Sequence, residues 1–231
     1  MNAIPDSRNL SRSVEDYLKA VYSLTQHGES ASTSALAESL DVAPPSVSGM
    51  IRRLSEQGLL NHVPYQGVAL TEAGRRAALK MVRRHRIIEA YLVDQLGYTW
   101  DTVHDEAERL EHAVSDTLIE RMAEALGSPQ FDPHGDPIPD AQGQIAELSY
   151  TPLCDVPDGE TVQVHRVMTR QADHLRYIGA SGLTPGAPVT VVRREPFNGP
   201  LTVRHDGGEQ VVAHAMAGLI MCVRPDLPTG L

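Results

Sequence analysis

The sequence predicts an α+β protein that is mainly α over its first two-thirds and carries a β-rich C-terminal domain. Apolar residues recur at helical spacing up to about residue 126. A segment rich in proline and glycine follows at 127–143, and from Leu148 the pattern changes to short β-rich runs. We therefore expect domains at 1–74, 75–140 and 148–231. A chain of 231 residues can give each its own core without disulfides.

The first two predicted helices each begin at a polar capping residue. Ser13 followed by Asp16 has the pattern of a capping box, and the apolar residues after it predict a helix that ends near Gly28. Ser32 or Thr33 can cap a second, short helix. That helix breaks at residues 41–43.

A third helix begins at Pro44 and Pro45, because proline is favoured in the first helical turn, and it runs up to Gly58. Two helices joined by a three-residue turn predict a helix-turn-helix. Strand-like runs at 59–63 and 68–71, separated by 64–67, predict a β-hairpin that would form a wing.

Two longer helices follow in the sequence. Thr71 is expected to cap one that runs to about Leu96. Thr102, with Asp105 three residues later, is expected to start another that continues without a break to Gly127. This second helix would carry an apolar line that seeks a partner helix, within the chain or across a dimer axis; its residues are Leu110, Val114, Leu118 and Met122.

The C-terminal part contains five short strand-like runs in about 80 residues, which predicts a small barrel or sandwich. The runs are 161–167, 188–193, 201–204, 210–214 and 219–223.

The net charge of −10 argues at first against a polyanion partner. The charge is segregated, however: the chain up to Ala90 has 11 Lys and Arg against 9 Asp and Glu, and the remainder has 9 against 21. Between Leu40 and Ala90 there are four more Lys and Arg than Asp and Glu. Such an excess is typical of a surface that binds a phosphate backbone and, equally, of a helix face exposed to solvent. Only two cysteines occur, which excludes a disulfide framework and a four-cysteine zinc site. No apolar run approaches the length of a membrane span, so we expect a cytoplasmic protein without a membrane partner.

Metal-competent side chains gather in the helical part. At about 100° per residue, four of them on the last predicted helix fall within an arc of roughly 100°. The preceding helix carries a His and a Glu four residues apart. A lone pair of this kind is more often a surface helix pair, and a cap alone would explain Asp16, but the combined set predicts metal binding. The set is His85, Glu89, His104, Glu108, Glu111 and His112.

These residues resemble the diphtheria toxin repressor family of metal-dependent transcriptional repressors. The resemblance covers nearly the whole chain and rests on motifs in one order and spacing. It implies a winged helix, a helical dimerisation region and, as in the longer members, a C-terminal SH3-like domain. The motifs are 13–18 (SVEDYL), 43–48 (APPSVS), 84–86 (RHR) with Glu89, 103–108 (VHDEAE) continuing to Glu111 and His112, and 132–139 (DPHGDPIP).

The resemblance implies two metal sites per protomer. The primary site would use Asp16, Glu108, Glu111 and His112. The second would use His85, Glu89 and His104, to which the SH3-like domain would add Gln171 and His174. Iron-responsive members have Met at position 16 and Cys at position 108, so hard carboxylates here favour Mn²⁺, with Fe²⁺ as the alternative. The shorter manganese-type members carry Glu where this chain has Lys19.

We therefore expect a repressor, not an enzyme, that senses metal and binds a palindromic double-stranded DNA operator of metal-homeostasis genes as a homodimer. The third helix would supply phosphate and base contacts. A metal-dependent hydrolase and a winged-helix sensor of an organic ligand are the alternatives, and both leave part of the pattern unexplained. The expected DNA-contacting residues are Pro44, Pro45, Ser46, Ser48, Arg52 and Arg53.

Overall fold

The computed structural model describes residues 10–26, 31–63, 67–146 and 148–224. The chain forms two compact units. The first comprises Met1–His85 with Pro139–Gln144, and the second comprises Arg86–Ile138 with Ile145–Leu231.

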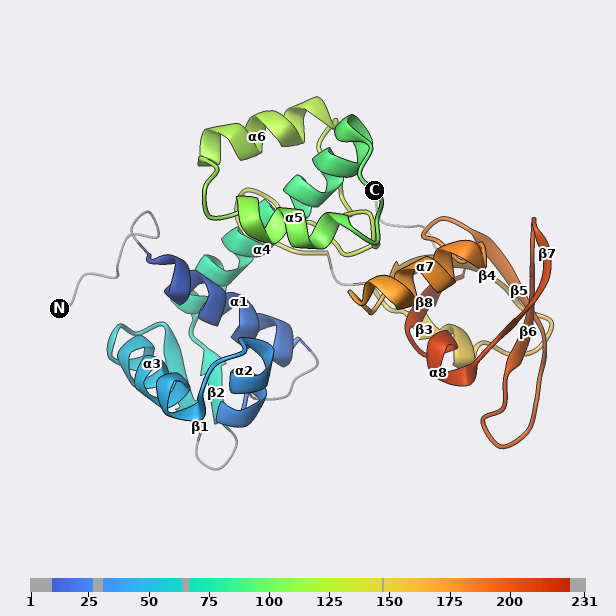
Figure 1. Ribbon diagram of the computed structural model, residues 1–231, viewed down its shortest axis with the longest axis horizontal. Coiled ribbons are helices and arrows are strands. Elements are labelled where there is room, and N and C mark those ends of the chain that lie inside the picture. Colours follow the sequence, from blue (N-terminus) through green and yellow to red (C-terminus); the bar gives the residue numbers. More distant parts are fainter. Residues whose placement is uncertain (1–9, 27–30, 64–66, 147, 225–231) are drawn as a thin grey trace. The chain divides into compact units, whose positions relative to one another are not determined.

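The first unit is a helix-turn-helix with a β-hairpin (Figure 1). Its three short helices pack around fully buried leucines, among them Leu18, Leu36 and Leu54. The hairpin strands pair antiparallel, and the turn predicted between them lies mostly outside the described residues. The elements are α1 (Arg12–Thr25), α2 (Thr33–Ser39), α3 (Pro44–Glu56), β1 (Leu60–Val63) and β2 (Gly67–Leu70), and α4 (Glu72–Leu96) begins in this unit.

The predicted capping box at the start of α1 is wrong. The N-cap of the helix is Ser11, two residues earlier than predicted, so Ser13 is already helical. Asp16 lies 4.0 Å from Arg12, one turn back on the same helix. Two serines compete for this helix start, and Ser11 has the extended backbone that an N-cap requires. Helix capping therefore does not explain why an aspartate occupies position 16.

The other helix starts of this unit agree with the sequence. Ser32 accepts a hydrogen bond from the Ala35 N–H at 3.1 Å. Pro44 and Pro45 occupy the first two positions of α3. Thr71 caps α4 by accepting from the Gly74 N–H at 3.0 Å. Each of these caps is formed by residues at the helix start itself.

The continuous helix predicted from Thr102 to Gly127 is wrong, because the chain forms two helices there, α5 (Val103–Leu110) and α6 (Asp116–Ala125). Glu111 is the C-cap of α5. Ser115 caps α6 by accepting from the Leu118 N–H at 3.2 Å. The predicted apolar line is broken as a result: Leu118 is exposed, whereas Ile119 is buried.

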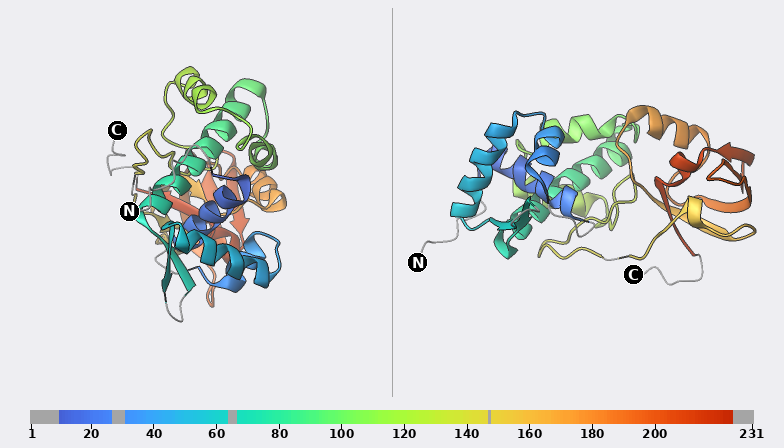
Figure 2. Two further views of the ribbon diagram at one scale, coloured as in Figure 1. Left: turned by 90° about the vertical axis from the view of Figure 1, so that its left-hand side faces the viewer. Right: turned by 90° about the horizontal axis from the view of Figure 1, so that it is seen from below.

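The second unit also contains a six-stranded antiparallel sheet with the order β3-β8-β4-β5-β6-β7, strongly bent and drawn in three orientations in Figures 1 and 2. All five predicted strands are present, with ends shifted by up to two residues. The short strand β3 and the helices α7 and α8 had no prediction. The elements are β3 (Thr151–Pro152), the 3-10 turn η2 (Leu153–Asp155), β4 (Thr161–Val167), α7 (Ala172–Ala180), β5 (Pro188–Arg194), β6 (Leu201–His205), β7 (Gly208–Val212), α8 (His214–Ala217) and β8 (Ile220–Val223).

Both cysteines lie in the core of this sheet domain as free thiols. Burial raises the pKa of the Cys222 thiol to about 12, and burial also raises the pKa of Cys154. A protonated, buried thiol is neither a nucleophile nor a metal ligand. Within the described part of the chain, no helix is long and apolar enough to cross a bilayer.

The segment predicted as a linker is packed over much of its length. A β-bridge joins Phe131 to Pro137, and residues 134–138 are all buried. The His134 carbonyl accepts a hydrogen bond from the Val167 N–H at 2.9 Å. We call residues 131–138 the DPHG loop. Its prolines and glycine serve a tight buried turn and do not form a flexible connection.

Candidate metal centre and DNA-binding face

The helix α3 has one buried and one exposed face. Val47, Ile51 and Leu54 are buried against the rest of the first unit. Their spacing of four and three residues turns the intervening polar positions outward. All six residues expected to contact DNA are exposed: Pro44, Pro45, Ser46, Ser48, Arg52 and Arg53.

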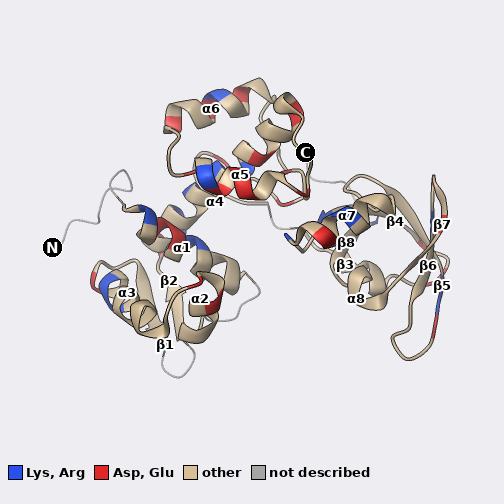
Figure 3. Ribbon diagram, viewed as in Figure 1, with Lys and Arg blue, Asp and Glu red and all other residues tan. Residues whose placement is uncertain are grey.

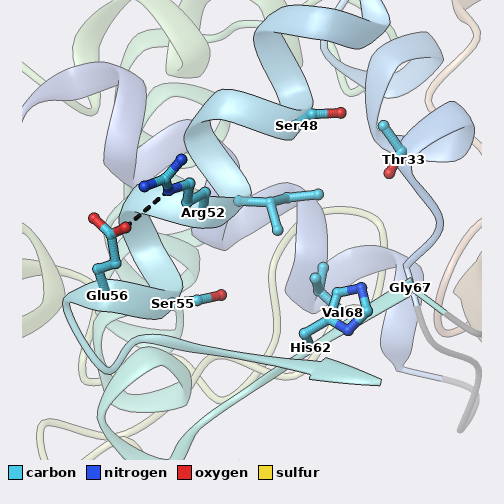
Figure 4. Close-up of a pocket in the computed structure, with 9 residues that line it drawn as sticks. Thr33, Ser48, Arg52, Ser55, Glu56, His62, Gly67 and Val68 are labelled. Atoms are coloured by element: carbon cyan, nitrogen blue, oxygen red, sulfur yellow. Dashed lines mark hydrogen bonds and ion pairs between the residues drawn. The ribbon is translucent and has the colours of Figure 1, made fainter. Parts of the chain in front are cut away.

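A pocket lies between α3 and the hairpin (Figure 4). Ser48, Arg52 and Ser55 of α3 line one side, and His62 and Val68 of the hairpin line the other. Arg52 donates to Glu56 at 2.9 Å, and both side chains are solvent-exposed. An exposed pair of this kind contributes little to stability, so Arg52 can exchange Glu56 for a phosphate at small cost. His62 and Ser55 were missed by the sequence analysis, which read the hairpin only as a wing.

The acids and bases of the helical segments are unevenly distributed (Figure 3). On α3, Arg52 and Arg53 outnumber the single acid Glu56. On α5, three acidic residues stand against one arginine. The acidic helix is the one that carries His104.

His85 and Glu89 lie four residues apart on α4 and are both buried. The Lys19 ammonium of α1 donates to His85 Nδ1 at 3.3 Å. A lone pair that accepts from an ammonium cannot bind a cation at the same time. Only His85 Nε2 could therefore hold a metal while this hydrogen bond persists.

His104 on α5 lies between two carboxylates. Its Nδ1 is 3.1 Å from Glu89 Oε1, and its Nε2 is 3.8 Å from Glu108 Oε1. With Nδ1–H donating to Glu89, the lone pair of a neutral ring is on Nε2, facing Glu108. A carboxylate that orients an imidazole in this way is the usual partner of a metal-binding histidine.

Glu111 and His112 follow directly at the end of α5. Glu111 is fully buried, and its Oε1 lies 3.4 Å from His112 Nε2. A buried carboxylate is costly unless a positive partner compensates its charge. Together with Glu108, these residues offer oxygen and nitrogen donors that fit a divalent first-row cation. Asp16, the remaining predicted ligand, lies on α1 in the first unit.

Gln171 and His174 lie at the start of α7 in the sheet domain. Gln171 is the exposed N-cap of that helix. His174 lies in its first turn, with Nδ1 3.4 Å from the Thr169 hydroxyl. His174 is half-buried.

A third group of metal-competent side chains lies in the second unit, where the sequence analysis expected only a linker. Glu89, Asp132 and His134 are all buried, and each offers one ligand atom within 4.8 Å of the other two. Burial, and secondly the charge of Glu89, raise the pKa of Asp132 to about 6. Spacing along the chain could not reveal this group, because Glu89 and the DPHG loop are more than forty residues apart.

Known proteins resemble the chain along almost its whole length. The family described as "Iron dependent repressor, N-terminal DNA binding domain" matches residues 9–68. The corresponding metal binding and dimerisation domain matches 71–140, and the FeoA domain matches 151–224.

Individual relatives and structures agree with this assignment. The iron-dependent repressor IdeR of Mycobacterium bovis is 32% identical over 222 residues, covering 88% of this chain and 93% of the relative. The diphtheria toxin repressor of Corynebacterium diphtheriae is 29% identical, covering 87% and 92%. A solved structure of a manganese-dependent transcriptional repressor in complex with manganese is 43% identical, with a TM-score of 0.83 and coverage of 91% and 99%. The manganese regulator SloR is 34% identical with a TM-score of 0.74, covering 93% and 100%. The chain therefore belongs to the diphtheria toxin repressor family, the iron-dependent repressors with an N-terminal DNA-binding domain, a metal-binding and dimerisation domain and a C-terminal FeoA domain.

Proposed function

We propose that the protein is a metal-dependent transcriptional repressor that senses Mn²⁺, with Fe²⁺ as the alternative, and binds a palindromic operator of metal-homeostasis genes as a homodimer. The observation that supports this proposal most strongly is that one chain contains both a DNA-binding fold and a set of metal-competent side chains. A helix-turn-helix exposes a polar and basic face on α3, and α4 and α5 carry a set of carboxylates and imidazoles. Relatives that match the chain over nearly their whole length are iron- and manganese-dependent repressors.

The primary site would couple the two units of the chain. Its ligands would be Asp16 from α1 with Glu108, Glu111 and His112 from α5 and the residues that follow it. Three carboxylates near one another repel, and a divalent cation would supply the positive charge that offsets this repulsion. Asp16 would then hold α1, and with it the helix-turn-helix, against the dimerisation region. The free energies of metal binding and DNA binding would thereby be coupled, so that each ligand raises the affinity for the other.

The second site would use His85 and His104, with Glu89 as orienting partner or ligand. Glu89 holds the His104 ring through Nδ1, so that Nε2 is the nitrogen available to the ion. Gln171 and His174 of α7 would add donors from the sheet domain. Such a site would fix the sheet domain when metal is present.

Replacing Glu108 with cysteine is expected to shift metal preference from Mn²⁺ toward Fe²⁺ and Co²⁺. A thiolate is a softer donor than a carboxylate and gains affinity along the late first-row series. Metal competition measured by equilibrium dialysis should show the order of affinities change by about tenfold or more. Glu106→Cys, on the same helix, is the control, and an unchanged preference in Glu108→Cys would exclude this side chain as a ligand.

Replacing Lys19 with methionine is expected to raise Mn²⁺ affinity at the His85 site several-fold. Methionine keeps a side chain of similar length but removes the ammonium that donates to His85 Nδ1 and repels a nearby cation. Isothermal titration with Mn²⁺ measures the change. Lys80→Met, a substitution of the same kind on α4, controls for loss of charge alone. Equal affinities in wild type and Lys19→Met would contradict an influence of Lys19 on the site.

DNA recognition would follow from the exposed face of α3. Ser46 and Ser48 can bond phosphates, Arg52 and Arg53 can neutralise them, and Pro44 and Pro45 present an apolar edge suited to thymine methyl groups. In a dimer, two such helices separated by about one duplex turn enter successive major grooves. Selection from a random duplex library, with Mn²⁺ and separately with a chelator, tests the proposal. We expect a palindrome to be enriched with Mn²⁺ only; enrichment of the same sequence under both conditions would overturn metal dependence.

A further inference from the structure

Gly49 lies in the interior of α3, between the exposed residues that are expected to contact DNA. It is exposed itself, and a Cβ added there would meet no atom within 4 Å. A glycine inside a helix is destabilising relative to alanine, because its backbone loses more conformational freedom on folding. The packing of the first unit therefore gives no reason for a glycine at this position.

Gly49 differs in this respect from every other glycine among the described residues. Each of the others either has a positive φ, which favours glycine, or has a neighbouring atom within 4 Å of the position that a Cβ would take. Gly58 also has open space around it, but its φ is +71°. A Cβ on Gly74 would collide with the Leu59 carbonyl oxygen. Neither backbone geometry nor contacts within the chain thus account for Gly49.

Gly49 stands at the centre of the exposed face of α3. At about 100° per residue, it points directly away from the buried face of this helix. The residues three and four positions away on either side are its neighbours on the helix surface. Because Gly49 has no side chain, the helix backbone is accessible between these neighbours, and we call this position the α3 notch. The neighbours are Pro45, Ser46, Arg52 and Arg53, and all four are exposed.

The chemistry of the α3 notch favours an apolar group. Within a helix, the N–H of Gly49 donates to the carbonyl four residues earlier, so it is not available to DNA. What the notch offers is the Cα of Gly49 beside the ring of Pro45, and both are apolar. Arg52 and Arg53 flank it on opposite sides and can hold phosphates there. In the major groove, the apolar group that a base pair presents is the C5-methyl group of thymine.

We propose that Gly49 is a specificity-determining residue for the operator, because the α3 notch admits the methyl group of one thymine in each half-site. This inference rests on the proposed function, since it takes α3 as the helix that enters the major groove. The missing Cβ leaves room for the methyl group and lets the helix backbone approach the base edge closely. Alanine at this position would place a carbon atom of similar size where the methyl group lies.

The first test compares wild type with Gly49→Ala on the duplex selected with Mn²⁺, at one salt concentration. Alanine favours the helix, so Gly49→Ala is expected to unfold at the same temperature as wild type or up to about 4 °C higher. Its dissociation constant for the duplex is nevertheless expected to rise about tenfold or more, because the Cβ and the methyl group cannot occupy the same space. A damaged fold would not give both results. A lower unfolding temperature or an unchanged dissociation constant would overturn the proposal.

Uracil substitution identifies the group that the notch admits, because uracil is thymine without the C5-methyl group. Each thymine of a half-site is replaced in turn, together with its symmetry mate. At one position, wild type is expected to lose about fourfold in affinity for each methyl group, or about 15-fold for both half-sites. At that position, Gly49→Ala is expected to bind the uracil duplex at least as tightly as the thymine duplex. Equal losses by both proteins at every thymine would overturn the proposal.

Ser23→Ala is the control for Gly49→Ala. Ser23 is exposed on α1 of the same unit, so its substitution also favours a helix but leaves α3 unchanged. It is expected to keep the wild-type affinity for the thymine and uracil duplexes.

The inference and the proposed function fail separately. Wild-type binding of the selected duplex that does not depend on Mn²⁺ would count against the sensor alone, because the thymine and uracil duplexes can still be compared. Mn²⁺-dependent binding in which Gly49→Ala changes the response to no thymine would count against the α3 notch alone.

Discussion

Replacing Asp16 with asparagine is expected to remove the Mn²⁺-induced gain in operator affinity, a loss of about 100-fold. Asparagine has the same shape and leaves the α1 backbone unchanged, but it lacks the charge that completes the primary set of carboxylates. A coupling free energy of 1–3 kcal/mol corresponds to about 5- to 150-fold in affinity. Asp16 would be the only ligand of the primary site that comes from the first unit. Fluorescence anisotropy of a labelled operator duplex, with and without Mn²⁺, measures the effect.

Glu38→Gln is the control for Asp16→Asn. Glu38 is an exposed acid on α2 of the same unit, so its substitution removes one negative charge without touching a proposed ligand. It is expected to keep the full response to Mn²⁺. A wild-type response in Asp16→Asn would show that α1 does not contribute a ligand and would remove the coupling between the two units.

Replacing Gly135 with alanine is expected to destabilise the second unit by about 3 kcal/mol or more. Gly135 has φ +85°, and a Cβ added there would lie 1.8 Å from the His165 carbonyl oxygen of β4. The backbone penalty of about 1–2 kcal/mol is then increased by overpacking, which typically costs another 1–3 kcal/mol. Urea unfolding followed by circular dichroism measures the loss.

Gly159→Ala separates the two causes of the Gly135 effect. Gly159 has the same φ of +85°, but a Cβ there would meet no atom within 4 Å. It is expected to lose only the backbone part, about 1–2 kcal/mol. Equal losses in both variants would mean that the DPHG loop does not press against β4 as described.

Local signals in the sequence predicted the first unit well. Ser32, Pro44 and Thr71 mark helix starts through hydrogen bonds or backbone angles that involve only nearby residues. Ser13 was wrongly predicted as a cap, because Ser11 two residues earlier occupies the N-cap position with an extended backbone. Both serines are suitable N-cap residues by type, and sequence spacing alone does not decide which of them begins the helix.

The break between α5 and α6 shows why periodicity can fail. Leu110, Val114, Leu118 and Met122 stand four residues apart, which a single helix would place along one side. Ser115 nevertheless caps a new helix, and Ser115 followed by Asp116 was the local signal that could have revealed it. Glu111 is consequently the C-cap of α5, and His112 lies beyond it. The sequence analysis had placed both residues in the middle of one continuous helix.

The DPHG loop could not be predicted from composition. Proline and glycine are typical of linkers, but here they permit a buried turn in which Asp132 accepts two backbone N–H groups. Asp136 pairs with Arg86 of α4 and with Arg166 and Arg170, which come from β4 and the residues after it. Only the folded chain brings these charges together, and with them the third group of candidate ligands.

The most direct test of the sensor is the affinity of the wild-type chain for its selected palindromic duplex at a fixed salt concentration. Phosphate contacts depend steeply on salt, so Mn²⁺ and a chelator must be compared at one ionic strength. We expect Mn²⁺ to lower the dissociation constant by about 50-fold or more relative to the chelator. Equal dissociation constants under the two conditions would contradict it.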